Sequence, residues 1–309
     1  MTTLFYRHPN FLLHDTGTGH PESAERIRAI SAALDGSAFS ALTRVEAPKA
    51  NLEQIRLIHP DAYVQRILKS IPTHGYAHAD GGDTVLSPGS GEAALHAAGA
   101  ACAAVDEILA GRANNAFCAV RPPGHHAEPS RAMGFCLFNN VAIAAAYARS
   151  SQRVRRLAIV DFDVHHGNGT QAAFFHEPDV LYASTHQSPL FPGTGQSHEI
   201  GVGNIVNVPL PPGSGSEQFQ EAVRQRILTA LHVFKPELLL ISAGFDAHRN
   251  DPLASLLLTE KDYAWITLEL IKIADLYCRG RVISVLEGGY NLEALAASSA
   301  AHVSALLSA

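Results

Sequence analysis

The stretch LAIVDFDVHHGNGT, residues 157–170, decides the fold that we predict for this chain. It begins with a short apolar run, which is typical of a buried strand in a parallel sheet. Its acids and histidines begin directly after that run. Open α/β sheets bind ligands beyond the carboxyl ends of their strands, so this stretch predicts both a strand and a site at its end.

The same arrangement recurs along the chain. Further buried strands are predicted at 117–120, 180–185, 204–208, 238–242 and 282–286. Apolar residues at three- and four-residue spacing predict helices between them, at 91–111, 138–150, 219–234 and 262–278. No linker, charge block or repeat divides the chain. We therefore expect an α/β fold of one domain over residues 1–309, with an open, mostly parallel sheet covered by helices on both faces.

The composition of the chain argues against several classes of function. The net charge of −6 argues against general attraction to nucleic acid. No apolar stretch reaches membrane-spanning length, and polar residues interrupt the N-terminal segment, unlike a signal peptide. Four scattered cysteines suggest reduced thiols, so we expect a cytoplasmic protein. The 17 histidines, many beside Gly, Pro or Asp, direct attention to metal or acid–base chemistry.

The segment DFDVHH is the first candidate for a metal site. An extended backbone would point Asp161, Asp163 and His165 to the same side. Asp246, in the loop after the strand at 238–242, is the best additional ligand. A catalytic zinc site needs about three N or O ligands and an open position for water. Any single Asp after a strand is more often a helix N-cap, but the combination favours a metal.

Two adjacent histidines and a tyrosine complete the candidate chemistry. His125 and His126 follow the rigid turn RPPG, and an amide hydrolase needs a base for water and an acid for the leaving amine. Asp161 and Asn168 are candidate partners, and only the carboxylate would raise the basicity of its ring. Tyr290 follows two glycines and could donate to an oxyanion. Adjacent histidines are otherwise usually accidents of a polar loop, and such a tyrosine is usually a core residue.

Seven motifs occur in an order that resembles the arginase/deacetylase superfamily, and within it the class II histone deacetylases and bacterial histone-deacetylase-like amidohydrolases. They are RPPGHHA, MGFCLFNNVAIAA, DFDVHHGNGTQ, LFPGTG, SAGFDAH, DPL and LEGGYNL. The resemblance runs from about residue 20 to residue 295. It implies the arginase/deacetylase fold and the hydrolysis of an acyl-amine, of the acetyl-lysine type, to a free amine and a carboxylate by metal-activated water.

The resemblance also assigns roles to residues. It implies one catalytic zinc ion held by Asp163, His165 and Asp246. It makes His126 the general base and later the acid, with His125 as its electrostatic partner. Tyr290 would polarise the substrate carbonyl.

Pairing and potassium binding follow from the same resemblance. It pairs His125 with Asp161 and His126 with Asn168, the latter an Asn as in class II and not the Asp of class I. It also implies a potassium ion near the zinc, bound by backbone carbonyls and by the side chains of Asp161 and Ser184.

Five further residues bear on substrate binding. Gly134, Phe135 and Phe191 resemble the walls of a narrow acyl-lysine channel; otherwise the two aromatics would be core residues. Leu253 matches an aliphatic gatekeeper of class II enzymes, where relatives that deacetylate polyamines have Glu. Asp83 lies where the family holds the substrate backbone, and capping of a turn is an equal alternative.

Three other functions stay open from sequence. One is deacetylation of acetylpolyamines or other small acylamines, another an arginase-like ureohydrolase with two manganese ions, and a third a module that binds acyl-lysine without cleaving it. The expected partner is an acylated lysine peptide or protein, or a small acylamine. Nothing indicates a corepressor partner. The sequence does not decide whether the protein forms a homo-oligomer or whether iron replaces zinc in the cell.

Overall fold

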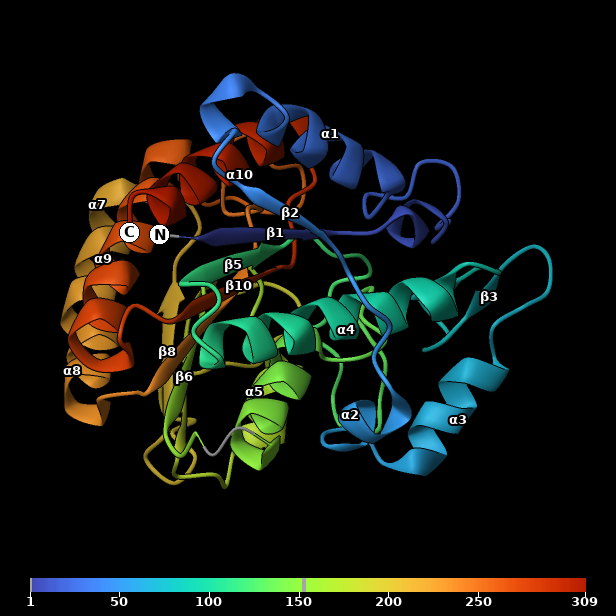
Figure 1. The fold of residues 1–309 in the computed structure, drawn as a ribbon, viewed down its shortest axis with the longest axis horizontal. Helices are drawn as coiled ribbons and strands as arrows, with labels where there is room; N and C mark the ends of the chain where they lie inside the picture. The colour runs from blue at the N-terminus through green and yellow to red at the C-terminus, as the bar shows by residue number, and fades with distance from the viewer. Residues whose placement is uncertain (1, 152–153) are drawn as a thin grey trace.

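The computed structural model describes residues 2–151 and 154–309. Eight parallel strands form one open sheet in the order β2-β1-β5-β10-β9-β6-β7-β8 (Figure 1). Their bounds are β1 Thr3–Arg7, β2 Thr43–Glu46, β5 Asn115–Cys118, β6 Leu157–Asp161, β7 Val180–Gln187, β8 Ile205–Leu210, β9 Leu238–Ala243 and β10 Val282–Leu286. A small antiparallel pair, β3 Ala77–His78 and β4 Val85–Leu86, lies outside this sheet. The predicted α/β architecture is confirmed.

The helices cover both faces of the sheet (Figure 1). Helices α4 and α5 pack against each other, whereas α10 packs against both α1 and α9. The bounds of the helices are α1 Ala24–Leu34, α2 Leu52–Arg56, α3 Asp61–Lys69, α4 Ser90–Leu109, α5 Asn140–Ser151, α6 Asn168–Phe174, α7 Ser216–Ala222, α8 Thr229–Phe234, α9 Glu260–Ile273 and α10 Leu292–Leu307. Helices α7 and α8 are joined by a π-helical stretch, Val223–Leu228, so the helix predicted at 219–234 is one run with a wider turn inside it.

The order of the strands positions the site. The four strands followed by polar clusters, β5, β10, β9 and β6, are consecutive neighbours in the centre of the sheet. After β5 the chain crosses to β6, and β9 and β10 later fill the two places between them. Because all four strands are parallel, the polar segments beyond their carboxyl ends meet at one edge.

The sequence prediction missed the strands β1 and β2, which lie at one end of the sheet. β2 is only partly buried and carries Arg44 and Glu46, so it lacks an apolar run. β1 is buried over four of its five residues but mixes polar and aromatic residues. In the described ranges, 2–151 and 154–309, no helix has both the length and the apolar character needed to cross a membrane.

Candidate active site

The metal ligands predicted in DFDVHH come together by a different backbone path from the one expected. Strand β6 ends at Asp161 and the chain then bends through residues 163–165, so the predicted extended backbone is wrong. The bend is held by its own acids. The N–H of Asp163 donates to Asp161 Oδ1 at 3.2 Å, and the N–H of His165 donates to Asp163 Oδ1 at 2.8 Å.

Asp246 joins this group from the loop after β9. His165 Nδ1 lies 3.1 Å from Asp163 Oδ1 and 3.2 Å from Asp246 Oδ2. One potential ligand atom from each of the three residues lies within 4.8 Å of the other two, and all three residues are buried. Backbone N–H groups orient both acids: Val164 donates to Asp246 Oδ1, and Gly288 to Asp163 Oδ2, each at 2.8 Å.

This group fits a divalent cation. Burial and then the charge of Asp163 raise the pKa of Asp246 to about 7, so two buried carboxylates face each other where a cation would stabilise both. Two glycines leave room for the two carboxylates. A Cβ on Gly244 would lie 2.0 Å from Asp163 Oδ2, and one on Gly288 would lie 2.0 Å from Asp246 Oδ2. Two oxygens and one imidazole nitrogen are a donor set that zinc accepts.

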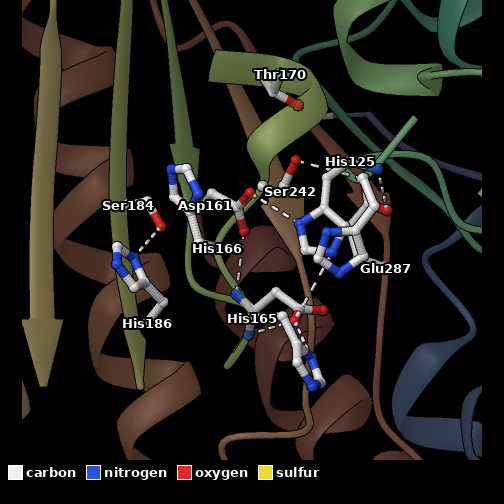
Figure 2. Close-up of polar contacts among 12 residues, drawn as sticks. His125, Asp161, His165, His166, Thr170, Ser184, His186, Ser242 and Glu287 are labelled. Atoms are coloured by element: carbon white, nitrogen blue, oxygen red, sulfur yellow. Dashed lines mark hydrogen bonds and ion pairs between the residues drawn. The ribbon is translucent and has the colours of Figure 1, made fainter. Parts of the chain in front are cut away.

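His125 lies in an acidic environment. Its ring Nδ1 is 3.0 Å from Asp161 Oδ2, and its backbone N–H donates to Glu287 Oε2 at 3.0 Å, as Figure 2 shows. Burial alone would lower the pKa of His125, but the charges of Asp163, Asp161 and Glu287 outweigh it and raise that pKa well above its usual value. A protonated ring is therefore favoured here.

His126 lies in a different environment although it is the next residue. Its Nδ1 is 2.8 Å from Asn168 Oδ1, and its ring centre lies 4.1 Å from that of His125 and 5.8 Å from that of His165. Burial, followed by the neighbouring imidazoles, lowers its pKa well below the usual value. The structure thus places both predicted pairs within hydrogen-bonding distance and favours a neutral His126.

Tyr290 reaches the site from the end of β10. Its N–H donates to Asp251 Oδ2 at 2.7 Å, and its ring meets the ring of Phe135 edge-on at 5.9 Å. The guanidinium of Arg26 lies 5.1 Å from the ring centre. Burial, and then the charge of Asp246, raise the pKa of Tyr290 well above its usual value. The phenol therefore stays protonated and can donate a hydrogen bond.

Two of the three predicted channel residues, Gly134 and Phe191, lie beside His126. A Cβ on Gly134 would approach His126 Cδ2 to 2.5 Å and Phe191 Cε1 to 3.0 Å, so the absence of a side chain there leaves room between the two rings. The ring centre of Phe191 lies 5.1 Å from that of His126, and the residue is 43% exposed. An aromatic residue that is both exposed and beside a buried histidine marks the route from solvent.

Leu253 and Asp83 lie in loops near this route. The N–H of Leu253 donates to Asp251 Oδ1 at 3.0 Å, and the other oxygen of that carboxylate holds Tyr290. The turn at Asp83 is capped by Asp80, whose Oδ1 accepts from the N–H groups of Gly82 and Thr84. The Asp83 carboxylate itself lies 3.5 Å from Thr84 Oγ1, within the same turn. The Asp83 carbonyl lies 3.2 Å from His20 Nε2, and the residue is exposed. Its contact with substrate stays a prediction.

The predicted potassium ligands are neighbours across two strands. Asp161 of β6 is in register with Ser184 of β7, and both are buried. Ser184 Oγ lies 2.9 Å from His186 Nδ1 (Figure 2). Asp161 Oδ2 also accepts from the hydroxyl of Tyr182 at 3.0 Å. The structure brings the pair together, and potassium binding stays a prediction.

Comparison with known proteins now decides the family. The family model described as the histone deacetylase domain matches residues 20–306. The chain belongs to the histone deacetylase family. It is 41% identical over 279 residues to a histone deacetylase-like amidohydrolase of Pseudomonas aeruginosa, covering 88% of this chain and 73% of that protein. It is 40% identical over 310 residues to the chloroplastic histone deacetylase 14 of Arabidopsis thaliana, covering 93% and 73%.

The fold agrees with this membership. The crystal structure of the HDA15 HD domain superposes with a TM-score of 0.93 at 35% identity, covering 99% of this chain and 90% of that one. The predicted family is therefore confirmed. Because one relative carries a chloroplastic name, the expected cytoplasmic location stays a prediction.

Sequence reasoning missed a buried ion cluster that supports the site of this histone deacetylase-family protein. The cluster comprises Glu22, Arg26 and Arg121, all fully buried. Arg121 donates to Glu22 Oε2 at 2.8 Å, and Arg26 Nε donates to the carbonyl of Gly289 at 2.7 Å. The signal was present in the sequence, because Arg121 follows the apolar run FCAV directly, but the partner lies 99 residues away.

Proposed function

We propose that this histone deacetylase-family protein hydrolyses an acyl-amine of the acetyl-lysine type. The observation that carries the proposal is the meeting of a buried Asp–His–Asp group with two adjacent histidines, one paired with a carboxylate and the other with a neutral amide. A group that binds a metal and a group that moves a proton lie at the same edge of the sheet. Amide hydrolysis requires both functions.

The metal we propose is zinc, held by Asp163, His165 and Asp246. When bound, it would polarise the substrate carbonyl and lower the pKa of a water molecule. Oxygen and nitrogen ligands accept several divalent metals, so iron is the alternative that metal analysis of the protein would reveal.

The side chains of this chain would then carry the proton. His126 accepts one proton from the attacking water through Nε2, because its Nδ1 faces Asn168 Oδ1. The new C–O bond forms, and the C–N bond breaks as His126 returns that proton to the leaving amine. His125 supplies positive charge next to the reacting groups. The hydroxyl of Tyr290 donates to the carbonyl oxygen as negative charge develops on it.

The surroundings favour an acyl-lysine over a polyamine. Gly134, Phe135 and Phe191 offer apolar contacts to an unbranched lysine stem. Leu253 stands where an acid would be needed to attract a cationic amine. A small acylamine is therefore our second candidate substrate, and we propose potassium at Asp161 and Ser184 as a structural ion.

The test is turnover of acetyl-lysine and trifluoroacetyl-lysine peptides by the purified protein, before and after chelation and zinc restoration. We expect cleavage that chelation abolishes and zinc restores. We also expect zinc to raise the Tm of the wild-type protein but not that of Asp246→Asn. Cleavage of acetylputrescine but not of either peptide would favour the small-amine substrate. A folded, zinc-loaded protein that cleaves none of the three would contradict hydrolysis and favour a binding module.

A further inference from the structure

One carboxylate near the site has no part in the mechanism above. Glu128 lies two residues after His126, in the tight turn 128–131, where its N–H donates to the carbonyl of Arg131 at 2.9 Å. Its Oε1 accepts a hydrogen bond from Asn168 Nδ2 at 2.8 Å. Asn168 Oδ1 lies 2.8 Å from His126 Nδ1. The side chains therefore form a chain from His126 through the Asn168 amide to Glu128.

The surroundings of Asn168 allow only one orientation of its amide. Three groups lie within reach of Nδ2: the Glu128 carboxylate at 2.8 Å, Met133 Sδ at 3.2 Å and the His126 carbonyl at 3.4 Å. All three are acceptors, and a carboxylate cannot donate. A flipped amide would place its oxygen against the charge of the half-buried Glu128 carboxylate. It would also leave two buried acceptors, Met133 Sδ and the His126 carbonyl, facing an oxygen that cannot donate. The amide nitrogen must therefore face Glu128.

The orientation of the amide determines where His126 carries its proton. Because the oxygen of Asn168 faces His126 and can only accept, Nδ1 of that ring must donate. Nε2 is then unprotonated in the neutral ring and is free to act as a base. With the amide flipped, Nδ1 would accept from Nδ2 and the proton would sit on Nε2, where it would block the reaction.

We propose that Glu128 is a positioning residue that fixes the orientation of the Asn168 amide and thereby holds His126 as its Nδ1–H tautomer. His125 has a carboxylate of its own, Asp161, at 3.0 Å. At its Nδ1, His126 instead meets the amide of Asn168, and the Glu128 carboxylate lies on the other side of that amide. Without such a neighbour the amide could face either way. The catalytic consequence rests on the proposed function, whereas the tautomer itself does not.

The turn that carries Glu128 is held rigidly. His59 Nδ1 lies 3.0 Å from the carbonyl of Pro129, and His59 Nε2 accepts from the N–H of Asn139 at 2.9 Å. His59 is fully buried. A substitution of the half-buried Glu128 side chain should therefore leave the turn in place and remove only its hydrogen bond.

Kinetics on an acetyl-lysine peptide separate positioning from a purely structural role. We expect Glu128→Ala to lower kcat at least ~10-fold with KM within about 2-fold, since a wrong tautomer costs up to ~10⁴ in a comparable histidine system. Glu128→Gln keeps an acceptor oxygen and should stay within about 3-fold of wild type. Glu177→Ala, which removes a surface partner of Arg149, is the matched control and should not change kcat.

An exchange of the two groups gives the sharpest test. Asn168→Asp alone places two carboxylates 2.8 Å apart and should lose at least ~10-fold in kcat. Adding Glu128→Gln supplies an amide donor to the new carboxylate, whose other oxygen can still accept from His126 Nδ1. The double variant should therefore recover most of the activity lost in Asn168→Asp. A double variant no better than Asn168→Asp would overturn the proposal.

A direct readout does not depend on turnover. In zinc-loaded protein with ¹⁵N-labelled histidine, the His126 signals, assigned with His126→Asn, should show a protonated Nδ1 in wild type and in Glu128→Gln. They should show a mixed or reversed tautomer in Glu128→Ala. An unchanged tautomer in Glu128→Ala would sink the idea. The expected tautomers in a protein that cleaves no substrate would support the positioning role and contradict only the proposed function.

Discussion

His125 and His126 are adjacent in the chain and both are buried, yet the pKa of His125 is raised above its usual value and that of His126 is lowered. The difference between them comes from their partners. Asp161 and Asp163 lie beside His125, whereas His126 faces the neutral amide of Asn168 and two other imidazoles. One ring is thus favoured as a cation and the other as a neutral base, which is the division of labour that proton transfer to and from an amide needs.

Replacing Tyr290 tests the oxyanion donor. Tyr290→Phe keeps the ring against Phe135 and Arg26 but removes the hydroxyl, so we expect kcat to fall roughly ten- to a thousandfold with little change in KM. Steady-state kinetics on an acetyl-lysine peptide measure this. Tyr277→Phe, which loses only a contact with His232, serves as the control. Full activity in Tyr290→Phe would remove Tyr290 from the mechanism.

The residues that could be predicted from sequence are those whose chemistry shows in a short motif. Asp163, His165 and Asp246 follow strands directly, and the structure brings them together. Glu22 and Asp251 could not be predicted, because each acts through a contact with a residue far along the chain: Glu22 with Arg121, and Asp251 with the backbone of Tyr290. A pattern along the sequence carries no information about such pairs until the strand order is known.

At the scale of elements, six of the eight strands of the sheet were predicted, and the central ones were the plainest because burial on both faces makes them apolar runs. The bend after β6 was not predictable from that pattern. It arises from hydrogen bonds between the acids and the backbone N–H groups that follow them, which replace the ladder of the sheet. The acids at the end of β6 therefore also determine the backbone path around the candidate metal ligands.

The loops after β9 and β10 lie close to the carboxylates of Asp163 and Asp246. Gly244→Ala tests whether the loop after β9 needs this close approach. Gly244 does not have a positive φ, so the expected effect comes from its Cβ meeting Asp163 Oδ2 at 2.0 Å and not from backbone strain. Displacing that carboxylate should weaken zinc binding at least ~10-fold.

Titration of the metal-free protein with zinc, followed by Tm, measures the loss. Gly215→Ala is the matched control, because the nearest atom to its Cβ would be 3.8 Å away. Equal zinc affinity in both variants would mean that the loop after β9 can retreat from the site.

For the molecule as a whole, acid stability depends on histidines buried in the neutral form. His302 of α10 is fully buried, and burial lowers its pKa to about 3. Thr267 donates to the carbonyl of Tyr263 at 2.6 Å, so its oxygen is free to accept from His302 Nδ1, also at 2.6 Å. Ser284 Oγ lies 2.8 Å from Nε2 and can donate to it. The neutral ring thus has both partners satisfied, and a proton on Nε2 would oppose the hydroxyl donor.

This arrangement predicts a loss of stability in mild acid. An unfolded histidine takes up a proton near pH 6.5, but folded His302 does so only near pH 3, so the unfolded chain binds more protons between these values. The contribution of His302 to the free energy of unfolding must therefore fall as pH falls from about 6.5, by about 2 kcal/mol between pH 7 and pH 5. Urea unfolding at the two pH values measures the total change. The difference in this change between wild type and His302→Gln isolates the contribution of the His302 ring, even if the variant is already less stable at pH 7.

The control is His74→Gln at an exposed position, which should leave the pH dependence of stability as it is in wild type. If His302→Gln loses as much stability as wild type between pH 7 and pH 5, the buried ring must accept a proton without cost, and another group would have to account for acid unfolding.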